Sequence, residues 1–366
     1  MSALKNLYSP SFYERLCAVL TKSLPSFDKD KFISLINSDG FEDKELKARM
    51  RHTAIVLHHF MPRDFGKAAD ALEVIIENAR KANFGEDGLA SMFLPDYIEV
   101  YGIIHYDDAV RALEFVTQYV SCEFAVRPFL IKYEDKMLKQ MLAWSLHDNY
   151  KVRRFASEGA RPRLPWAMAI PSLKKDPSAV LPILENLKND PSDFVRRSVA
   201  NNLNDIAKDH PDVVLAIAKK WKGTSAATDA IVKHGSRTLL KQGHPEILKL
   251  YGLDATHIAH AGFEVLTPVV KLGDSVEFTF IIENKDDKPQ TVRLEYGLYY
   301  MKAKGHLAKK VFKISEKTYQ PGEKAAIVRK QSFRAITTRV FHLGEHKVSL
   351  IINGEEKEIA AFELIT

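Results

Sequence analysis

Apolar residues recur at intervals of three and four along the first two-thirds of the chain, a spacing that places them on one face of an α-helix. Ser9 and Pro10 mark the start of one such helix, because proline needs no backbone N–H at the first helical position. The spacing predicts further helices at residues 31–36, 43–60, 67–81 and 107–119, without strand-like alternation between them. This part of the chain is therefore expected to be all-α.

A repeat begins after residue 176. Pro177, Pro211 and Pro245 are 34 residues apart, and each precedes a similar apolar pattern. A second helix is expected between successive prolines, starting near Pro191 and near Ala227. A period of this length is typical of helix-pair solenoids, in which each unit stacks on its neighbours. The Val-Arg-Arg sequence, present at 152–154 and again at 195–197, favours HEAT-like repeats over tetratricopeptide repeats.

Near residue 254 the pattern changes to alternation of apolar and polar residues, which predicts β-strands. The alternation is strict at 275–280 and 292–296 and partial at 347–350 and 359–364, with turn residues between these segments. Several short strands over about 110 residues indicate an immunoglobulin-like β-sandwich without its disulfide. The predicted protein is multidomain: an all-α HEAT-like solenoid at 1–254, followed by an all-β immunoglobulin-like sandwich at 255–366.

The composition narrows the class of protein. With 366 residues, 46% hydrophobic and 27% charged, the chain is an ordinary globular sequence long enough for two domains. It has two cysteines, no apolar run of transmembrane length and no signal-peptide pattern, so we expect a reduced, soluble, cytoplasmic protein without a membrane partner. His257 and His260 have a plausible i, i+3 spacing for metal ligands but no nearby carboxylate or cysteine ligand, and no Gly-rich phosphate loop is present, so neither a metal nor a cofactor is expected.

Charged residues cluster in the stretch 148–166. Five of the thirteen residues from Lys151 to Arg163 are basic, and one, Glu158, is acidic. Neighbouring cations favour the ionised form of a carboxyl group, so this pattern predicts a phosphate-binding surface that contains one fixed negative charge. The net charge of +6 is not concentrated in either half of the chain, and a nucleic-acid surface would therefore depend on such local clusters.

The repeat extends this charged surface. Alignment of the two Val-Arg-Arg sequences places Arg197, Asn201 and Asp205 on an exposed polar ridge beside Glu158. The next unit offers a ridge of cations at the same spacing of four, namely Lys233, Arg237 and Lys241. We infer that these ridges lie side by side on the concave face of the solenoid.

The string Val152-Arg-Arg-Phe-Ala-Ser-Glu-Gly-Ala-Arg-Pro-Arg-Leu-Pro-Trp166 resembles the HEAT-like-repeat alkylpurine DNA glycosylases of the AlkC type. The segment 234–241 is similar to the family's next repeat, and the C-terminal part resembles the immunoglobulin-like domain that a subset of AlkC proteins carry. The resemblance implies excision of cationic N-alkylated bases, such as 3-methyladenine, from duplex DNA. It also implies that the lesion is exposed by bending the duplex rather than by complete base flipping.

The resemblance further implies roles for individual residues. It implies that Glu158 is catalytic, with Asp205 and Glu123 as further acidic candidates. It also implies that Trp166 contacts the lesion or its deoxyribose. Of the aromatic pair that related glycosylases present here, only Trp166 is evident. The expected phosphate contacts, including the ridge cations, are Arg154, Arg161, Arg163, Arg197, Lys233, Arg237 and Lys241. The expected partner is alkylated double-stranded DNA, bound by a monomer at the nucleoid.

Each of these residues also has a purely structural interpretation. Glu158 could pair with Arg154 one turn before it, Asp205 could pair with Lys208, Glu123 could sit at a helix N-terminus, and Trp166 could pack between repeats. Arg153 and Arg196 are expected to be structural, each paired with the aspartate of the preceding turn, Asp148 and Asp190 respectively.

Two other functions stay open at this level. Helical solenoids commonly present their concave surface to peptides, so a protein-binding scaffold without catalysis is one alternative. A DNA-binding protein that senses lesions without excising them is the other. The sequence leaves open whether 3-methyladenine, 3-methylcytosine or 1-methyladenine is preferred, which carboxylate positions the water, and whether activity needs the sandwich.

Overall fold

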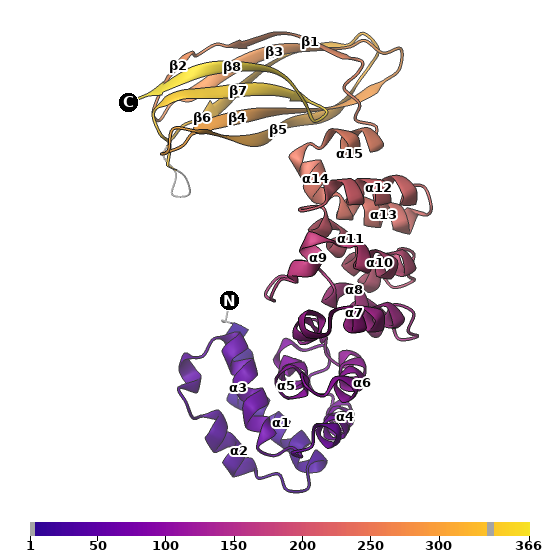
Figure 1. Ribbon diagram of the computed structural model, residues 1–366. Coiled ribbons are helices and arrows are strands. Elements are labelled where there is room, and N and C mark those ends of the chain that lie inside the picture. The colour runs from indigo at the N-terminus through magenta and orange to yellow at the C-terminus, as the bar shows by residue number, and fades with distance from the viewer. Residues whose placement is uncertain (1–3, 335–339) are drawn as a thin grey trace. The chain divides into compact units, whose positions relative to one another are not determined.

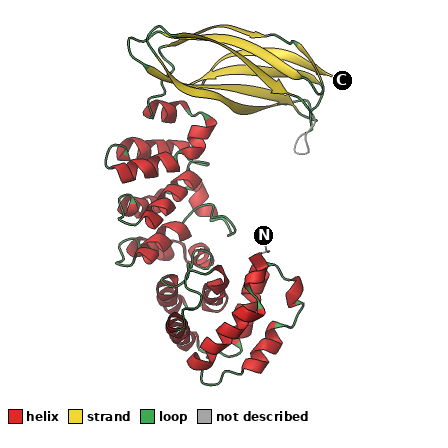
Figure 2. Cartoon of the chain, turned by 180° about the vertical axis from the view of Figure 1, so that it is seen from behind, coloured by secondary structure: helices red, strands yellow, loops and turns green. Residues whose placement is uncertain are grey.

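A computed structural model describes residues 4–334 and 340–366 (Figure 1). The described chain is helical as far as Leu250 and forms strands from Ile258 onward, as Figure 2 shows, which confirms the predicted fold class. Two compact units are present, one comprising residues 1–214 and 220–235 and the other residues 215–219 and 236–366. No helix within the described residues combines the length and the apolar character needed to cross a membrane.

The α-helices run in chain order as follows: α1 (Pro10–Ser23), α2 (Lys29–Ile36), α3 (Leu46–His58), α4 (Phe65–Lys81), α5 (Phe93–Gly102), α6 (Tyr106–Thr117), α7 (Val126–Trp144), α8 (Tyr150–Gly159), α9 (Pro171–Lys175), α10 (Leu181–Leu187), α11 (Asp193–Ile206), α12 (Pro211–Trp221), α13 (Ala226–Gly235), α14 (Arg237–Gln242) and α15 (Pro245–Leu250).

The predicted early helices correspond to α1, α2, α3, α4 and α6. At the start of α1, the Ser9 hydroxyl accepts a hydrogen bond from the Phe12 backbone N–H over 3.2 Å, as a capping serine does. The third helix begins at Leu46 rather than at residue 43, because residues 41–43 form a 3₁₀ turn. Helix α5 was not predicted, because its residues 93–98 are all buried and therefore show no one-sided apolar stripe.

The repeated helices begin close to the predicted positions. Pro211 and Pro245 are the first residues of α12 and α15, and α13 begins at Ala226. By contrast, Pro177 precedes a 3₁₀ turn, and α11 begins at Asp193, after Ser192 rather than at Pro191. Helix α8 packs against α11, and α11 packs against α13, which is the nearest-neighbour stacking expected of a solenoid.

The predicted ridge of Lys233, Arg237 and Lys241 is not on one helix. Helix α13 ends at Gly235 and α14 begins at Arg237, with Ser236 between them. Gly235 allows close packing on α11, because a Cβ atom there would lie 2.9 Å from the Leu203 Cβ. The interruption also separates the three cations between the two compact units, with Lys233 in the first and the other two in the second.

Helix α8 has one apolar face, on which Val152, Phe155 and Ala156 recur at intervals of three and four and are all fully buried. Gly159, however, is the last helical residue and not a left-handed cap. A glycine is needed there because α7 approaches closely: an added Cβ would lie 2.7 Å from the Val126 Cγ1 and 2.9 Å from the Met141 Cε.

The strands form the two sheets of a sandwich, one ordered β1-β3-β6 and the other β2-β8-β7-β4-β5. Their bounds are β1 (Ile258–Val265), β2 (Val269–Lys271), β3 (Ser275–Asn284), β4 (Gln290–Met301), β5 (Leu307–Tyr319), β6 (Lys324–Ser332), β7 (Gly344–Ile352) and β8 (Glu355–Ile365). The predicted alternation appears directly in β3, where Val276, Phe278, Phe280 and Ile282 are buried and the residues between them are not. No cysteine lies in this domain; Cys17 and Cys122 are both free and buried in the helical part.

We predict that Gly159→Ala lowers the free energy of unfolding by about 1–3 kcal/mol, because the new methyl group overpacks the contact between α7 and α8. The measurement is chemical denaturation followed by circular dichroism. Gly66→Ala is the matched control, because a Cβ at this α4 residue would be no closer than 3.3 Å to its nearest neighbours, the Asp64 and Asp108 carboxylate oxygens. Equal stability of Gly159→Ala and the wild type would contradict the packing argument.

Candidate functional site

Glu158 and Asp205 meet on a single guanidinium group. Arg161, just beyond the end of α8, donates from Nη1 to the Glu158 Oε1 over 2.6 Å and from Nε to the Asp205 Oδ2 over 2.8 Å. The exposed fractions are 5% for Glu158, 1% for Asp205 and 6% for Arg161. The two acidic residues from adjoining repeats therefore lie close together, as the alignment predicted, but both are buried and not open to solvent. The expected exposure of Asp205 on a surface ridge is wrong, and so is a surface position for Arg161.

Other donors complete the coordination of these carboxylates. The Ser198 hydroxyl donates to the Glu158 Oε2 over 2.7 Å, and the Lys208 ammonium donates to the Asp205 Oδ1 over 3.0 Å. Burial alone would lower the pKa of Arg161, but the neighbouring carboxylates outweigh it and raise that pKa. The cluster is thus a buried ion network in which every charge has a partner, as such groups require.

Arg127 lies beneath this network and is a residue that the sequence analysis missed. This α7 side chain is fully buried, and it donates from Nη1 to the backbone oxygens of Gly159 and Arg161 over 3.0 and 2.8 Å. Its Nε donates to the backbone oxygen of Met168. Burial, aided by the nearby charge of Arg161, lowers the pKa of Arg127 to about 10. Arg127 therefore fixes the backbone from the end of α8 through the loop that follows it.

Arg154 connects the third acidic candidate to the other two. Its Nη1 donates to Glu123, which precedes α7, and its Nη2 lies 3.6 Å from the Glu158 Oε1. The same guanidinium lies 4.7 Å above the centre of the Phe194 ring. Glu123, Arg154 and Phe194 line part of a cavity of about 530 Å³. The predicted pair of Glu158 with Arg154 is therefore present, but it is one contact within a larger network.

Trp166 lies in the loop between α8 and α9 and is 60% exposed, so it does not pack between repeats. Its φ of 65° is left-handed, a conformation that bulky residues rarely adopt. The Lys47 ammonium donates to the Trp166 backbone oxygen and lies 5.1 Å above the centre of the Phe124 ring. Phe124 is thus a second aromatic residue near Trp166. The sequence analysis passed over it, although it directly follows Glu123.

The remaining predicted cations differ in exposure. Arg197 on α11 is 67% exposed and pairs with the equally exposed Asp193. Arg163 makes a two-pronged pair with Asp209, with its Nε 2.9 Å from one carboxylate oxygen. Lys233 and Lys241 are exposed, and Arg237 is half-buried. Arg163, Arg197 and Lys233 thus lie at the surface of the helical unit that contains the carboxylates.

Arg153 and Arg196 are structural, but their pairing differs from the prediction. Each donates to the backbone oxygen of the expected aspartate, which is Asp148 for Arg153 and Asp190 for Arg196. The Asp190 carboxylate instead accepts from Arg153, over 2.6 Å to Nε. The arginine of one repeat therefore binds the turn of the next one, which joins successive units.

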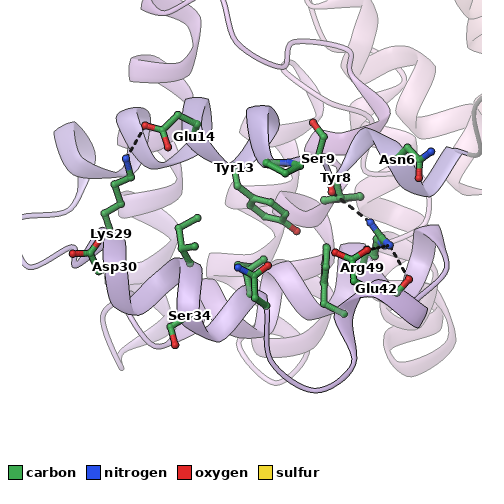
Figure 3. A pocket seen from close by; sticks show the side chains of 15 residues that line it. Asn6, Tyr8, Ser9, Tyr13, Glu14, Lys29, Asp30, Ser34, Glu42 and Arg49 are labelled. Atoms are coloured by element: carbon green, nitrogen blue, oxygen red, sulfur yellow. Dashed lines mark hydrogen bonds and ion pairs between the residues drawn. The ribbon is translucent and has the colours of Figure 1, made fainter.

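A groove of about 650 Å³ between α1 and α2 is distant in sequence from these residues (Figure 3). Its basic side chains are already engaged: Lys29 lies 2.6 Å from Glu14, and Arg49 donates to the backbone oxygens of Lys44 and Glu42. No cluster of histidine, cysteine and acidic residues arranged to hold a metal ion occurs in the described part of the chain. The acidic network around Arg161 is therefore the strongest candidate for chemistry.

Two family models and one curated protein match the chain. A model described as DNA alkylation repair enzyme matches residues 116–239, and a model described as the C-terminal Ig-like domain of uncharacterised protein YhaZ matches residues 259–366. The uncharacterized protein YhaZ of Bacillus subtilis (strain 168) is 42% identical over 365 residues, covering 100% of both chains.

A solved structure is similar over the whole length. It is that of the Pseudomonas fluorescens alkylpurine DNA glycosylase AlkC bound to DNA containing an abasic site analog, with a TM-score of 0.86 and 34% identity over 100% of both chains. The repair-enzyme model covers residues 116–239, and this segment contains Glu158, Arg161, Trp166 and Asp205. The chain belongs to the AlkC-like family of DNA alkylation repair proteins, in which a HEAT-like helical domain precedes an immunoglobulin-like domain.

Proposed function

We propose that this protein is a DNA glycosylase that hydrolyses the N-glycosidic bond of cationic N-alkylated bases in duplex DNA and leaves an abasic site. The observation that carries the proposal is the convergence of Glu158 and Asp205 on Arg161, beside the loop that bears the exposed Trp166. The similarity to AlkC, whose structure contains DNA with an abasic site analog, supports it.

The chemistry suits carboxylates. A cationic base is already a good leaving group, so its departure needs little protonation and leaves positive charge on the sugar, as in other glycoside hydrolysis. A fixed carboxylate stabilises that charge and orients the attacking water. We assign this role to Glu158, with Asp205 and Glu123 as the further acidic candidates beside it. A neutral base gains less from a nearby carboxylate than a cationic one, so we expect selectivity for cationic lesions.

The buried guanidinium groups then act on the protein rather than on DNA. Arg161 is committed to two carboxylates, so we assign it to holding them in register. Arg154, bound to Glu123 and near Glu158, holds the third acid in the same way and remains a candidate for a phosphate beside the lesion. A planar guanidinium suits this work because its fork of donors binds two acceptors at fixed angles.

Cations that reach the surface suit contacts with the DNA backbone. We propose that Arg163, Arg197 and Lys233 bind phosphates in the first unit, and that Lys241 and the half-buried Arg237 do so in the second. The exposed pair of Arg197 with Asp193 costs little to break, because such pairs contribute only about 0–1 kcal/mol. Trp166 would then pack on the lesion or its deoxyribose, with the duplex bent rather than the base fully flipped. The protein would act as a monomer at the nucleoid, in the cytoplasm.

We predict that Glu158→Gln lowers the release of 3-methyladenine from methylated duplex DNA about 100-fold or more, because the charge opposite the developing cation is lost. Chromatography of the freed bases measures this, and a filter-binding assay checks that DNA affinity is retained. Glu77→Gln removes an exposed carboxylate paired with Arg80 and serves as the control.

The other outcomes separate the alternatives. Full activity of Glu158→Gln would refute the catalytic assignment. DNA binding by the wild type without any base release would indicate a lesion sensor, and binding that does not depend on salt would indicate a protein scaffold. Release of hypoxanthine, a neutral lesion, as fast as 3-methyladenine would contradict the electrostatic account.

We also predict that Arg197→Gln weakens binding to any duplex sequence and lowers the slope of log affinity against log salt by about 0.9, the value for one lost phosphate contact. Titration of labelled duplex at several salt concentrations measures this slope. Arg111→Gln on α6 is the matched control, because Arg111 is also an exposed, ion-paired arginine but lies outside the segment matched by the repair-enzyme model. An unchanged slope for Arg197→Gln would exclude the contact.

A further inference from the structure

Trp166 combines two properties that do not normally occur together. Its side chain is 60% exposed, yet its backbone has a φ of 65°, which is unfavourable for a bulky residue. Such a conformation persists only where surrounding groups hold it, and it is found preferentially at functional sites. An exposed indole cannot be held by its own packing, so the restraint must act on the backbone of the loop.

Two cations from different helices supply that restraint. Arg127 on α7 donates to the backbone oxygen of Met168, on one side of the strained residue. Lys47 on α3 donates to the backbone oxygen of Trp166 itself. The Lys47 ammonium also lies 5.1 Å above the centre of the Phe124 ring, a favourable cation–π arrangement. One ammonium group therefore connects both aromatic residues of the candidate site.

Helix α3 presents Lys47 from a fixed position. One turn later on the same helix, Arg51 binds Asp96 over 2.6 Å and Glu99 over 2.7 Å, both on α5. Lys47, Arg51 and Phe124 line a cavity of about 270 Å³ together with Met168. Residues 46–58 lie outside the segment 116–239 that matches the repair-enzyme family, so that match gives α3 no role in the site.

We infer that Lys47 is a positioning residue of the active site, which holds Trp166 in its left-handed conformation and Phe124 beside it. The inference rests on the proposed function, in which the Trp166 indole contacts the lesion or its deoxyribose. The N-terminal helices thereby contribute directly to the geometry of base excision. Loss of Lys47 should leave the fold intact but make the Trp166 indole more mobile, because this lysine is exposed and its backbone contact is with the Trp166 loop.

The tryptophans of the chain allow the position of this indole to be measured without activity. Trp144 and Trp221 are 1% exposed, whereas Trp166 is 60% exposed. Fast local motion in the time-resolved fluorescence anisotropy should therefore come from Trp166, and Trp166→Phe verifies that assignment. We predict that Lys47→Met increases the amplitude of this fast component. Lys47→Arg should keep the amplitude close to that of the wild type.

The matched control is Lys44→Met. Lys44 also donates to the backbone oxygen of a residue with positive φ, Asp39, but it is not among the contacts of the Trp166 loop. This variant loses the same charge and the same kind of bond, and its anisotropy should equal that of the wild type. Thermal unfolding of all variants confirms that the fold is retained.

The same variants are then tested with methylated duplex DNA. Lys47→Met should lower kcat for 3-methyladenine release by about 10- to 100-fold, the usual cost of misplacing a positioning group, with KM nearly unchanged. Lys47→Arg should recover most of the rate, and Lys44→Met should leave it unchanged. An unaltered anisotropy in Lys47→Met would overturn the inference, and so would an altered anisotropy with full kcat. If the wild type releases no base, the proposed function fails, and the anisotropy alone decides whether Lys47 positions Trp166.

Discussion

The candidate site depends on one interaction, the bridge that Arg161 forms between Glu158 and Asp205. Three charged side chains are removed from water here, and their desolvation is offset by short hydrogen bonds to each other and by those from Ser198 and Lys208. Loss of any member leaves a buried charge without its partner, which costs more than the bond itself contributes. The bridge also joins α8 to α11. The geometry of the carboxylates therefore depends on the stacking of these two repeats.

A second buried cation makes this bridge possible. Arg127 satisfies its charge with backbone oxygens rather than with carboxylates, and two of these oxygens belong to Gly159 and Arg161. The end of α8 is therefore held from below while Arg161 points toward the acids. The two guanidinium charges lie close enough to oppose each other, which contributes to the lowered pKa of Arg127. Glu158 and Asp205 supply the negative charge that stabilises both.

Burial divides the cations of the helical unit into two groups. The buried ones, Arg49, Arg127 and Arg161, bind groups of the protein and have little freedom left for a ligand. Exposed ones such as Arg197 have weak, screened partners that phosphate can replace. A sequence pattern that counts basic residues cannot separate the groups, because both occur within the same few turns. Their separation requires the position of each side chain relative to solvent.

The sequence by itself determined the local structure: the apolar stripe of α8, the helix starts at Pro10 and Pro211, and the alternation in β3 follow from spacing alone. Helical periodicity also placed Asp205 on the repeat beside Glu158, whereas the catalytic role of both residues follows from the resemblance to AlkC proteins and stays a prediction. Only the tertiary structure decided that Arg161 is buried between them, that Gly159 serves packing, and that Lys47 and Arg127 hold the Trp166 loop. The physical reason is the separation along the chain of the residues that make contact. Periodicity reports which face a residue occupies on its own helix, whereas the contacts of Arg127 with Met168, Arg161 with Asp205 and Lys47 with Trp166 join residues 41, 44 and 119 positions apart, and their energies depend on burial created by the whole fold.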